Sequence, residues 1–200
     1  MKKKAFFIIL FIISLFSCQS NSSAIFKDMY AGYFEIAEEF YNLKKYDKAA
    51  IYYEKCLKDK DSSERRSVQY KLAKTYIQQQ KYDKAEHIYR ELLEIDGQNM
   101  NLKSSIAFCM IKTNRYDEAE KIYLDLIKED SVENSNYKNL LVLQIIKGDF
   151  DKADETLSKY KELFPLDESI QSLEDDLKKA KQKKIENEEE KAIESEKDVL

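Results

Sequence analysis

The sequence predicts an all-α fold, an α-solenoid of four helix–turn–helix repeats that ends in a C-terminal capping helix. The first observation is one pattern that recurs four times: KYDKAAIYYEKCL at 45–57, KYDKAEHIYRELL at 81–93, RYDEAEKIYLDLI at 115–127 and DFDKADETLSKYK at 149–161. The second is the scarcity of helix breakers, since the chain has one Pro and three Gly. The third is a composition of 43% hydrophobic and 36% charged residues, which suits helices with one buried and one solvated face.

The copies recur at intervals of 36, 34 and 34 residues, and each continues upstream as another helical pattern. Within 28–165 we therefore expect repeats at about 30–63, 66–99, 100–133 and 134–165, each a helix, a short polar turn and a second helix. One such helix pair cannot bury its apolar face alone, so the pairs must stack. An amphipathic bundle with chance similarity is the alternative, but it would not recur at this spacing.

The period and the residues at fixed positions resemble the tetratricopeptide repeat (TPR) family. The family pattern asks for a small residue where the two helices cross, and four alanines fill that position: Ala49, Ala85, Ala119 and Ala153. A later aromatic position holds Tyr in three copies and Leu in the fourth: Tyr53, Tyr89, Tyr123 and Leu157. The resemblance implies a superhelix whose concave wall is formed by the first helix of each repeat.

A further amphipathic stretch follows the fourth repeat and can cover its open end. Ile170, Leu173 and Leu177 stand at helical spacing there, so we expect a capping helix over 166–181. The remaining stretch, 182–200, is charged and has too few apolar positions for a core. It fits either an exposed charged helix or a disordered tail.

The N-terminus, MKKKAFFIILFIISLFSCQS, is typical of a targeting segment. Three lysines precede an apolar run from Ala5 to Phe16, which is shorter than the roughly 20 residues that span a membrane. The ending LFSC resembles a bacterial lipobox, although Phe16 departs from the usual small residue. We therefore expect a lipoprotein signal peptide over 1–17, a lipid anchor on Cys18 and a polar tether over 18–27. A plain secretory signal or an uncleaved anchor is the alternative.

Several kinds of chemistry are disfavoured by the sequence. The net charge of −4 without a basic stripe argues against nucleic-acid binding. His87 is the one histidine, and we expect it on a solvated helix face rather than in a catalytic triad. A histidine pair for a metal cannot form. Cys56 and Cys109 fall in different repeats, and we expect buried free thiols. We predict no enzyme, no metal and no cofactor, and we expect the aspartates after each repeated aromatic residue to cap helices: Asp47, Asp83, Asp117 and Asp151.

The resemblance also implies where a partner would bind. It places an apolar, partly aromatic floor on the concave wall, suited to a protein or peptide segment. The residues expected there are Phe34, Tyr41, Tyr70, Lys74, Ile77, Phe108, Ile111, Val142 and Ile145. One TPR subclass grips C-terminal carboxylates with Lys, Asn and Arg, but here Phe34, Glu38 and Ser105 stand at those positions. A carboxylate clamp is therefore not expected.

Together these features predict a membrane-anchored adaptor of the bacterial cell envelope, at the outer membrane rather than the inner one. The alternatives are a structural lipoprotein that forms homo-oligomers and a component of an outer-membrane protein or pilus assembly machine. A ligand-binding accessory lipoprotein would need an enclosed pocket, which four repeats rarely make.

Overall fold

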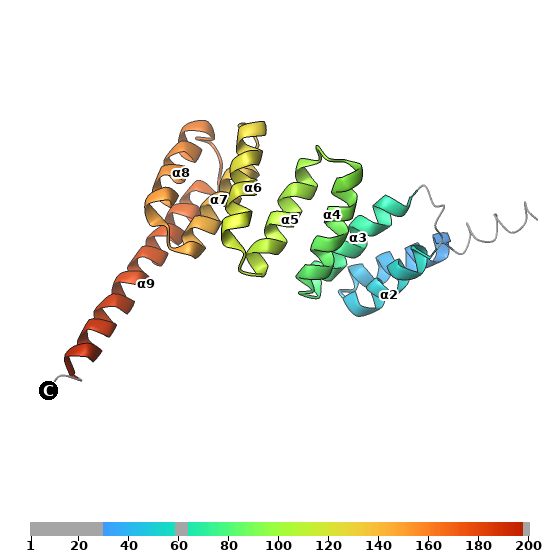
Figure 1. Ribbon diagram of the computed structural model, residues 1–200, viewed down its shortest axis with the longest axis horizontal. Coiled ribbons are helices and arrows are strands. Elements are labelled where there is room, and N and C mark those ends of the chain that lie inside the picture. The colour runs from blue at the N-terminus through green and yellow to red at the C-terminus, as the bar shows by residue number, and fades with distance from the viewer. Residues whose placement is uncertain (1–29, 59–63, 198–200) are drawn as a thin grey trace, which may run out of the picture. The chain divides into compact units, whose positions relative to one another are not determined.

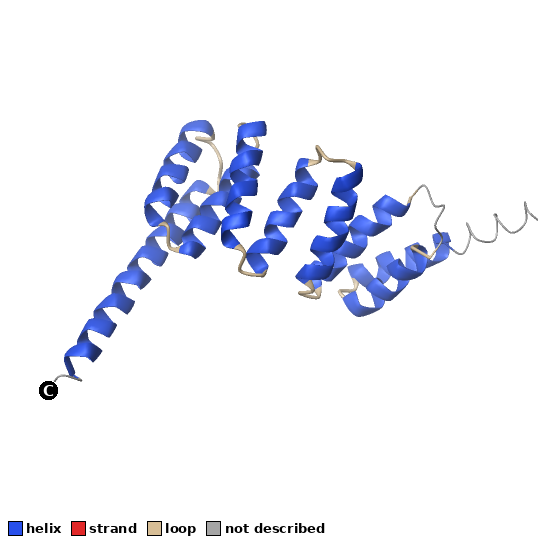
Figure 2. Ribbon diagram, viewed as in Figure 1, coloured by secondary structure: helices blue, strands red, loops and turns tan. Residues whose placement is uncertain are grey.

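The computed structural model describes residues 30–58 and 64–197, and every regular element in these two ranges is an α-helix (Figures 1 and 2). The helix over 30–42 comes first. It is followed by α2 (Tyr46–Cys56), α3 (Arg65–Gln78), α4 (Tyr82–Ile95), α5 (Met100–Lys112), α6 (Tyr116–Glu129), α7 (Asn134–Lys147), α8 (Phe150–Leu163) and α9 (Ile170–Lys197). The chain divides into two compact units, Met1–Ile95 (unit 1) and Asp96–Leu200 (unit 2). None of the helices in the described part is long and apolar enough to cross a membrane.

Unit 1 contains two helix pairs, the helix over 30–42 with α2 and then α3 with α4. Small side chains lie where the paired helices cross, and each is fully buried: Ala37, Ala49, Ala73 and Ala85. α3 also packs against α2, which joins the two pairs. Leu72 on α3 is buried, whereas the corresponding Ile36 is 37% exposed. The predicted stacking of repeats is thus present within unit 1.

Unit 2 contains the pairs α5–α6 and α7–α8, and α7 also packs against α6. Ala107, Ala119 and Ala153 are fully buried at the crossings, while Leu141 takes the place of an alanine on α7. The larger side chain still fits, since it lies fully buried in a core cluster with Tyr137, Ala153, Leu157, Tyr160, Leu173 and Leu177. The cysteines behave as predicted, because Cys56 and Cys109 are both free and buried. Burial raises the pKa of the Cys56 thiol to about 11, so it stays protonated at neutral pH.

The turn inside each repeat has the same backbone geometry. One residue adopts a left-handed conformation with φ between 56° and 75°: Lys44, Gln80, Asn114 and Gly148. The next residue donates its backbone N–H to a carbonyl five positions earlier, as Lys45 does to Phe40 at 2.8 Å and Asp149 does to Gln144 at 3.0 Å. These bonds form the Schellman motif, which satisfies carbonyls at the end of the first helix.

The prediction that the repeated aspartates cap the second helices is wrong. Asp47, Asp117 and Asp151 lie inside the first turns of α2, α6 and α8, one residue after each helix begins. The residues at the cap positions make no side-chain cap bond: Lys45, Arg115 and Asp149. The residue that closes the Schellman motif of the first helix is also the N-cap of the second, as Arg115 and Asp149 show, so the aspartate two positions later falls inside the helix. There its charge still favours the helix dipole.

The side-chain caps in unit 2 stand instead before the first helices and before α9. The side chain of Asn99 accepts from the backbone N–H of Leu102, and Glu133 accepts from that of Ser135. These acceptors and Asp167, which precedes α9, recur at intervals of 34 residues. The connections between repeats therefore carry a second repeated pattern, a polar side chain that caps the next helix. This pattern was not recognised from the sequence.

The capping helix is present, although its bounds differ from those predicted. It begins at Ile170 rather than at residue 166, because Asp167 accepts from the backbone N–H and the hydroxyl of Ser169 at 2.8 and 2.5 Å and holds the preceding turn. Leu173 and Leu177 are buried against α7 and α8. The helix then continues without interruption to Lys197, so most of the charged stretch over 182–200 is helical.

Candidate functional site

All nine side chains predicted to bind a partner lie on the first helices of repeats. Unit 1 holds Phe34, Tyr41, Tyr70, Lys74 and Ile77, and unit 2 holds Phe108, Ile111, Val142 and Ile145. None of them is fully buried. Lys74, Phe108 and Val142 are exposed, and the others are partly buried. These residues thus lie on the first helices of each unit, and we call each group the first-helix face of its unit.

The first-helix face of unit 1 is organised around Glu38. Its carboxylate accepts hydrogen bonds from the Tyr53 hydroxyl on α2 and from Lys71 Nζ on α3, the latter at 2.6 Å. Burial alone would raise the pKa of Glu38, but these hydrogen bonds outweigh burial and lower it. Burial and the neighbouring carboxylate in turn raise the pKa of Tyr53. One ionised side chain therefore ties three helices together beneath this face.

Aromatic rings surround that carboxylate. Phe34 stacks on Tyr30 with a centroid distance of 6.3 Å and meets the Tyr53 ring edge-on at 6.2 Å. Lys71 Nζ lies 5.4 Å from the centre of the Phe34 ring, so the ion pair and the ring share one cation. The charge of Glu38 is thereby already compensated. The face therefore presents aromatic rings to a partner, and not a free carboxylate.

A second aromatic group lies on α3. The ring of Tyr70 lies 5.7 Å from that of Tyr89, and Lys74 Nζ lies 6.0 Å from the Tyr70 centroid. Lys74 is exposed, and in the described residues it forms no ion pair. This part of the face can therefore stack against an apolar side chain and still present one cation.

The first-helix face of unit 2 is more aliphatic. Phe108 is 38% exposed, with Lys112 Nζ 5.4 Å from its ring centre, and Val142 is 42% exposed. Ile145 partly packs against the core cluster, so it supports the fold as well as lining the face. Ile146 is 50% exposed beside it and offers more apolar surface than Ile145 does.

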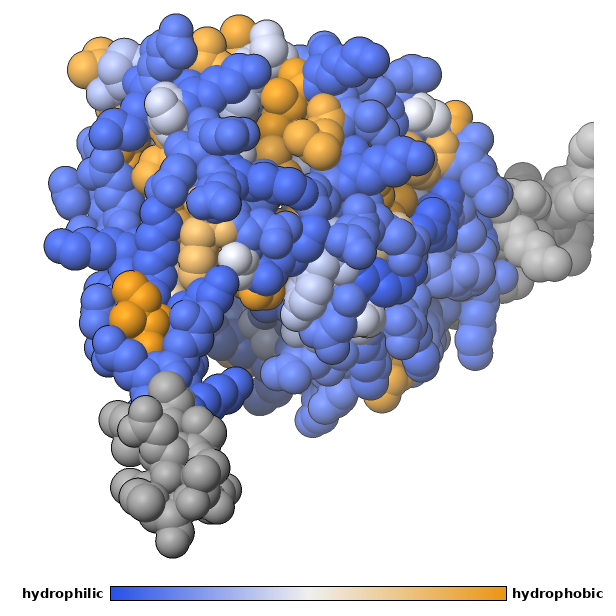
Figure 3. Space-filling model, turned by 60° about the vertical axis from the view of Figure 1, so that its left-hand side comes forward, coloured by the Kyte–Doolittle hydropathy of each residue, from blue (hydrophilic) through white to orange (hydrophobic). Residues whose placement is uncertain are grey.

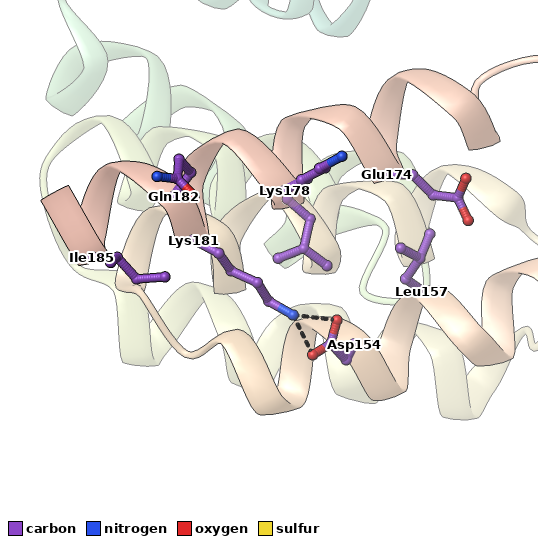
Figure 4. A pocket seen from close by; sticks show the side chains of 8 residues that line it. Asp154, Leu157, Glu174, Lys178, Lys181, Gln182 and Ile185 are labelled. Carbon is purple, nitrogen blue, oxygen red and sulfur yellow. Dashed lines mark hydrogen bonds and ion pairs between the residues drawn. The ribbon is translucent and has the colours of Figure 1, made fainter.

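Two hollows lie away from these faces. One, of about 370 Å³, lies between α8 and α9 and is closed on one side by Lys181, which binds Asp154 at 2.5 Å (Figure 4). Its apolar lining comes from Leu157, Leu177 and Ile185. The other, of about 440 Å³, lies at the turns of unit 1 and is lined mainly by lysines. On the face drawn in Figure 3, apolar side chains form separate patches within a mostly hydrophilic surface.

His87 is exposed on α4, with Nε2 3.4 Å from Glu91. Among the described residues, no group of three or more His, Cys, Asp or Glu side chains could hold a metal ion. The network of Glu38, Tyr53 and Lys71 was not predicted from the sequence, although Glu38 stands at helical spacing with the apolar residues Phe34 and Tyr41.

Comparison with known proteins supports the repeat assignment. Two family models described as tetratricopeptide repeat match the sequence, over residues 76–143 and 30–58. None of the proteins with curated functions matches it.

Solved structures of low identity share the fold. A tetratricopeptide repeat protein from Parabacteroides merdae ATCC 43184 matches with a TM-score of 0.65 and 15% identity, over 78% of this chain and 61% of that chain. The chain thus spans less than two thirds of that protein. A MamA protein matches with a TM-score of 0.58 and 21% identity, over 83% of this chain and 95% of that chain. The Yersinia enterocolitica type III secretion chaperone SycD, solved with a peptide of the translocator YopD, matches with a TM-score of 0.52 and 22% identity. The match covers 63% of this chain and 99% of that chain.

Three observations indicate one family: the matching family models, the small residues at the helix crossings and the shared fold of the solved structures. The chain belongs to the tetratricopeptide repeat family, whose all-α helical-solenoid fold serves as a scaffold for protein–protein interaction.

Proposed function

We propose that this protein is a lipid-anchored scaffold of a bacterial cell envelope that captures a segment of a partner protein on its first-helix faces. The observation that carries the proposal is the aromatic face of unit 1, where Phe34, Tyr41 and Tyr70 stay partly accessible. Glu38 and Lys71 fix this face from below, so a partner would meet rings already held in place. Such preorganised aromatic anchors reduce the entropy lost on binding.

Peptide capture by a chain of similar fold supports this proposal. SycD was solved in complex with a peptide of YopD, and it shares the fold at a TM-score of 0.52. The likeness concerns the fold alone, since the identity is 22%. The chemistry of the faces suggests a segment with apolar side chains, because exposed Phe108, Val142 and Ile146 in unit 2 add aliphatic surface.

The proposed anchor rests on the N-terminal sequence, which lies outside the described residues. Lys2, Lys3 and Lys4, the apolar run and the LFSC ending together support lipidation of Cys18. We propose the outer membrane as the destination because Gln19, rather than Asp, follows the cysteine. Metabolic labelling with palmitate tests this step, and Cys18→Ala should lose both the label and the membrane fraction.

Partner capture is tested by crosslinking the full-length protein in membranes and purifying its adducts. The double variant Tyr70→Ser/Phe108→Ser should lose the adducts, because both rings leave the faces. The matched control is Ile51→Ser/Leu124→Ser, which removes exposed apolar side chains (51% and 50%) from second helices. Adducts that persist in the Tyr70/Phe108 variant would refute the proposed faces. Loss of its helical circular dichroism would show instead that the two rings belong to the core.

A further inference from the structure

The lysine-lined hollow of unit 1 lies where the turns of its two repeats meet. Its lining comes from residues 44–48 and from Gln78, Gln79 and Lys81. Gln79 joins the turns by donating from Nε2 to the Tyr46 carbonyl at 2.8 Å. Four lysines and one aspartate line the hollow, which gives it a net charge of +3 in a chain whose net charge is −4. We call this site the lysine hollow.

Most of these cations are not neutralised by the fold. Lys81 lies 3.9 Å from Asp47, whose side chain is 89% exposed. Within the described residues, Lys44, Lys45 and Lys48 form no ion pair, and Lys48 lies 5.4 Å from the ring centre of Phe40. Lys44, Lys45 and Lys48 thus bring three positive charges to a hollow whose one carboxylate, that of Asp47, already faces Lys81. An anionic partner would relieve the repulsion between these charges.

The corresponding turns of unit 2 are arranged differently. There Lys147 binds Asp117 at 2.8 Å and Asp149 at 3.3 Å, and it also binds Glu120. Lys152 reaches Glu120 from the other side at 3.2 Å. Lys147 and Lys152 are therefore paired within unit 2. Lysines without an ion pair at the turns, as in unit 1, are thus not a general requirement of this fold.

Lys44 also occupies a costly backbone position. Its φ is 56°, in the left-handed region, where unit 2 has Asn114 and Gly148. Side chains other than Gly, Asn and Asp are disfavoured there, because Cβ lies too close to the following carbonyl oxygen. A lysine at this position therefore adds charge to the hollow at the expense of the turn.

An acidic helix segment of matching character projects from unit 2. Residues 186–190 of α9 read ENEEE, and all of them are exposed. Glu186, Glu189 and Glu190 share one side of the helix, since residues three and four apart lie on the same face. None of the three forms an ion pair with the described residues, and Glu186 accepts only from Gln182 at 3.1 Å.

We propose that the lysine hollow of one copy binds the acidic segment 186–190 of α9 from a second copy. This pairing goes beyond the proposed partner capture, because it uses the turns of unit 1 and not the first-helix faces. It is a head-to-tail contact between two different surfaces. After one contact the first copy keeps a free acidic segment and the second keeps a free hollow, so the contact can propagate into chains.

The test is sedimentation velocity of the full-length protein in a non-ionic detergent, at about 50 mM and about 500 mM NaCl, where screening differs strongly. The wild type should associate at low salt and disperse at high salt. Lys44→Glu/Lys45→Glu and Glu189→Lys/Glu190→Lys should each associate at least about tenfold more weakly, since each replaces attraction by repulsion. An equimolar mixture of the two variants should associate again, because the intact acidic segment of the lysine variant can bind the intact hollow of the glutamate variant, and the two reversed surfaces are also complementary.

Two controls separate this contact from others. Lys121→Glu/Lys128→Glu reverses exposed lysines of α6 and should associate like the wild type. Tyr70→Ser/Phe108→Ser should also associate normally, so failure of partner capture and failure of this contact are distinguishable.

Three results would overturn the proposal. One is a wild type that stays monomeric at low salt, and another is a mixture of the reversed variants that fails to associate. The third is a Lys44/Lys45 variant that self-associates normally but no longer binds vesicles of anionic phosphatidylglycerol. That result would assign the hollow to a membrane surface instead.

Discussion

Lys71 on α3 donates a hydrogen bond to Glu38, which lies 33 residues earlier in the chain, with an Nζ–Oε2 distance of 2.6 Å. The same carboxylate accepts from Tyr53, whose side chain is buried. This pair therefore links the two repeats of unit 1 through one partly buried charge. It also lies directly beneath the aromatic face proposed to bind a partner, so stability and binding are coupled there.

Glu38→Ala should lower the free energy of unfolding by about 1–3 kcal/mol, because the Tyr53 hydroxyl loses its acceptor inside the fold. Urea unfolding followed by circular dichroism measures the change. Glu39→Ala is the matched control, since Glu39 is exposed on the same helix and should change little. Equal stability of the two variants would show that water replaces the Glu38 carboxylate without loss.

The stabilisation from Glu38 should depend on pH. Its pKa is lowered in the folded protein, so its contribution is present above the unfolded pKa and is lost as pH falls through the folded pKa. The stability difference between wild type and Glu38→Gln should therefore shrink between about pH 6 and about pH 3. Urea midpoints at several pH values test this, and a difference that grows on acidification would contradict the assigned network.

Substitutions at two left-handed turn residues should change the free energy of unfolding in opposite directions. Gln80→Gly should raise the free energy of unfolding by up to about 1 kcal/mol, because glycine adopts positive φ without steric cost. Gly148→Ala should lower it by about 1–2 kcal/mol. No atom lies within 4 Å of an added Cβ at Gly148, so the cost would come from the backbone alone. Thermal unfolding of both variants measures the two effects, and shifts of the same sign would exclude this origin.

The fold was predictable because its strongest constraints are local and repeated. A small residue is required wherever two helices cross, and Ala49, Ala85, Ala119 and Ala153 show that requirement at every copy. The buried free cysteines followed from the same register. The partner-binding residues could be placed on first helices for this reason, but their roles remain a prediction.

The polar networks were not predictable in the same way. Glu38 and Lys71 belong to different repeats, and many acids and lysines of this chain share their spacing. Which of them pair depends on side-chain reach across two helices, and the repeat pattern does not encode that. The lysine hollow was hidden for the same reason, because Lys44 and Lys81 come together only when two turns meet.

Lys147→Met should destabilise unit 2 by about 1–3 kcal/mol, since it leaves the buried carboxylate of Glu120 with one cation fewer. The loss should be smaller in the background Glu120→Gln, because a neutral amide needs no counter-charge. A double-mutant cycle in urea measures this coupling. Additive effects would mean that Lys152 alone satisfies Glu120.

Asp167 gives a prediction about the capping helix. Its carboxylate accepts from the backbone N–H of Ser169 and from Asn134 Nδ2, the latter at 2.8 Å, and so joins the start of α9 to the start of α7. Hydrogen bonds from Ser169 and Tyr160 hold the pKa of Asp167 far below its ordinary value. Asp167→Ala should therefore speed amide hydrogen exchange over 170–180, where α9 packs against α7 and α8.

Asp175→Ala, which removes an exposed acid on the same helix, is the control and should leave exchange unchanged. Acidification should mimic the variant only well below pH 3.8, because the depressed pKa keeps the carboxylate ionised above it. Protection of 170–180 that survives in Asp167→Ala would show that Leu173 and Leu177 hold the helix without this anchor.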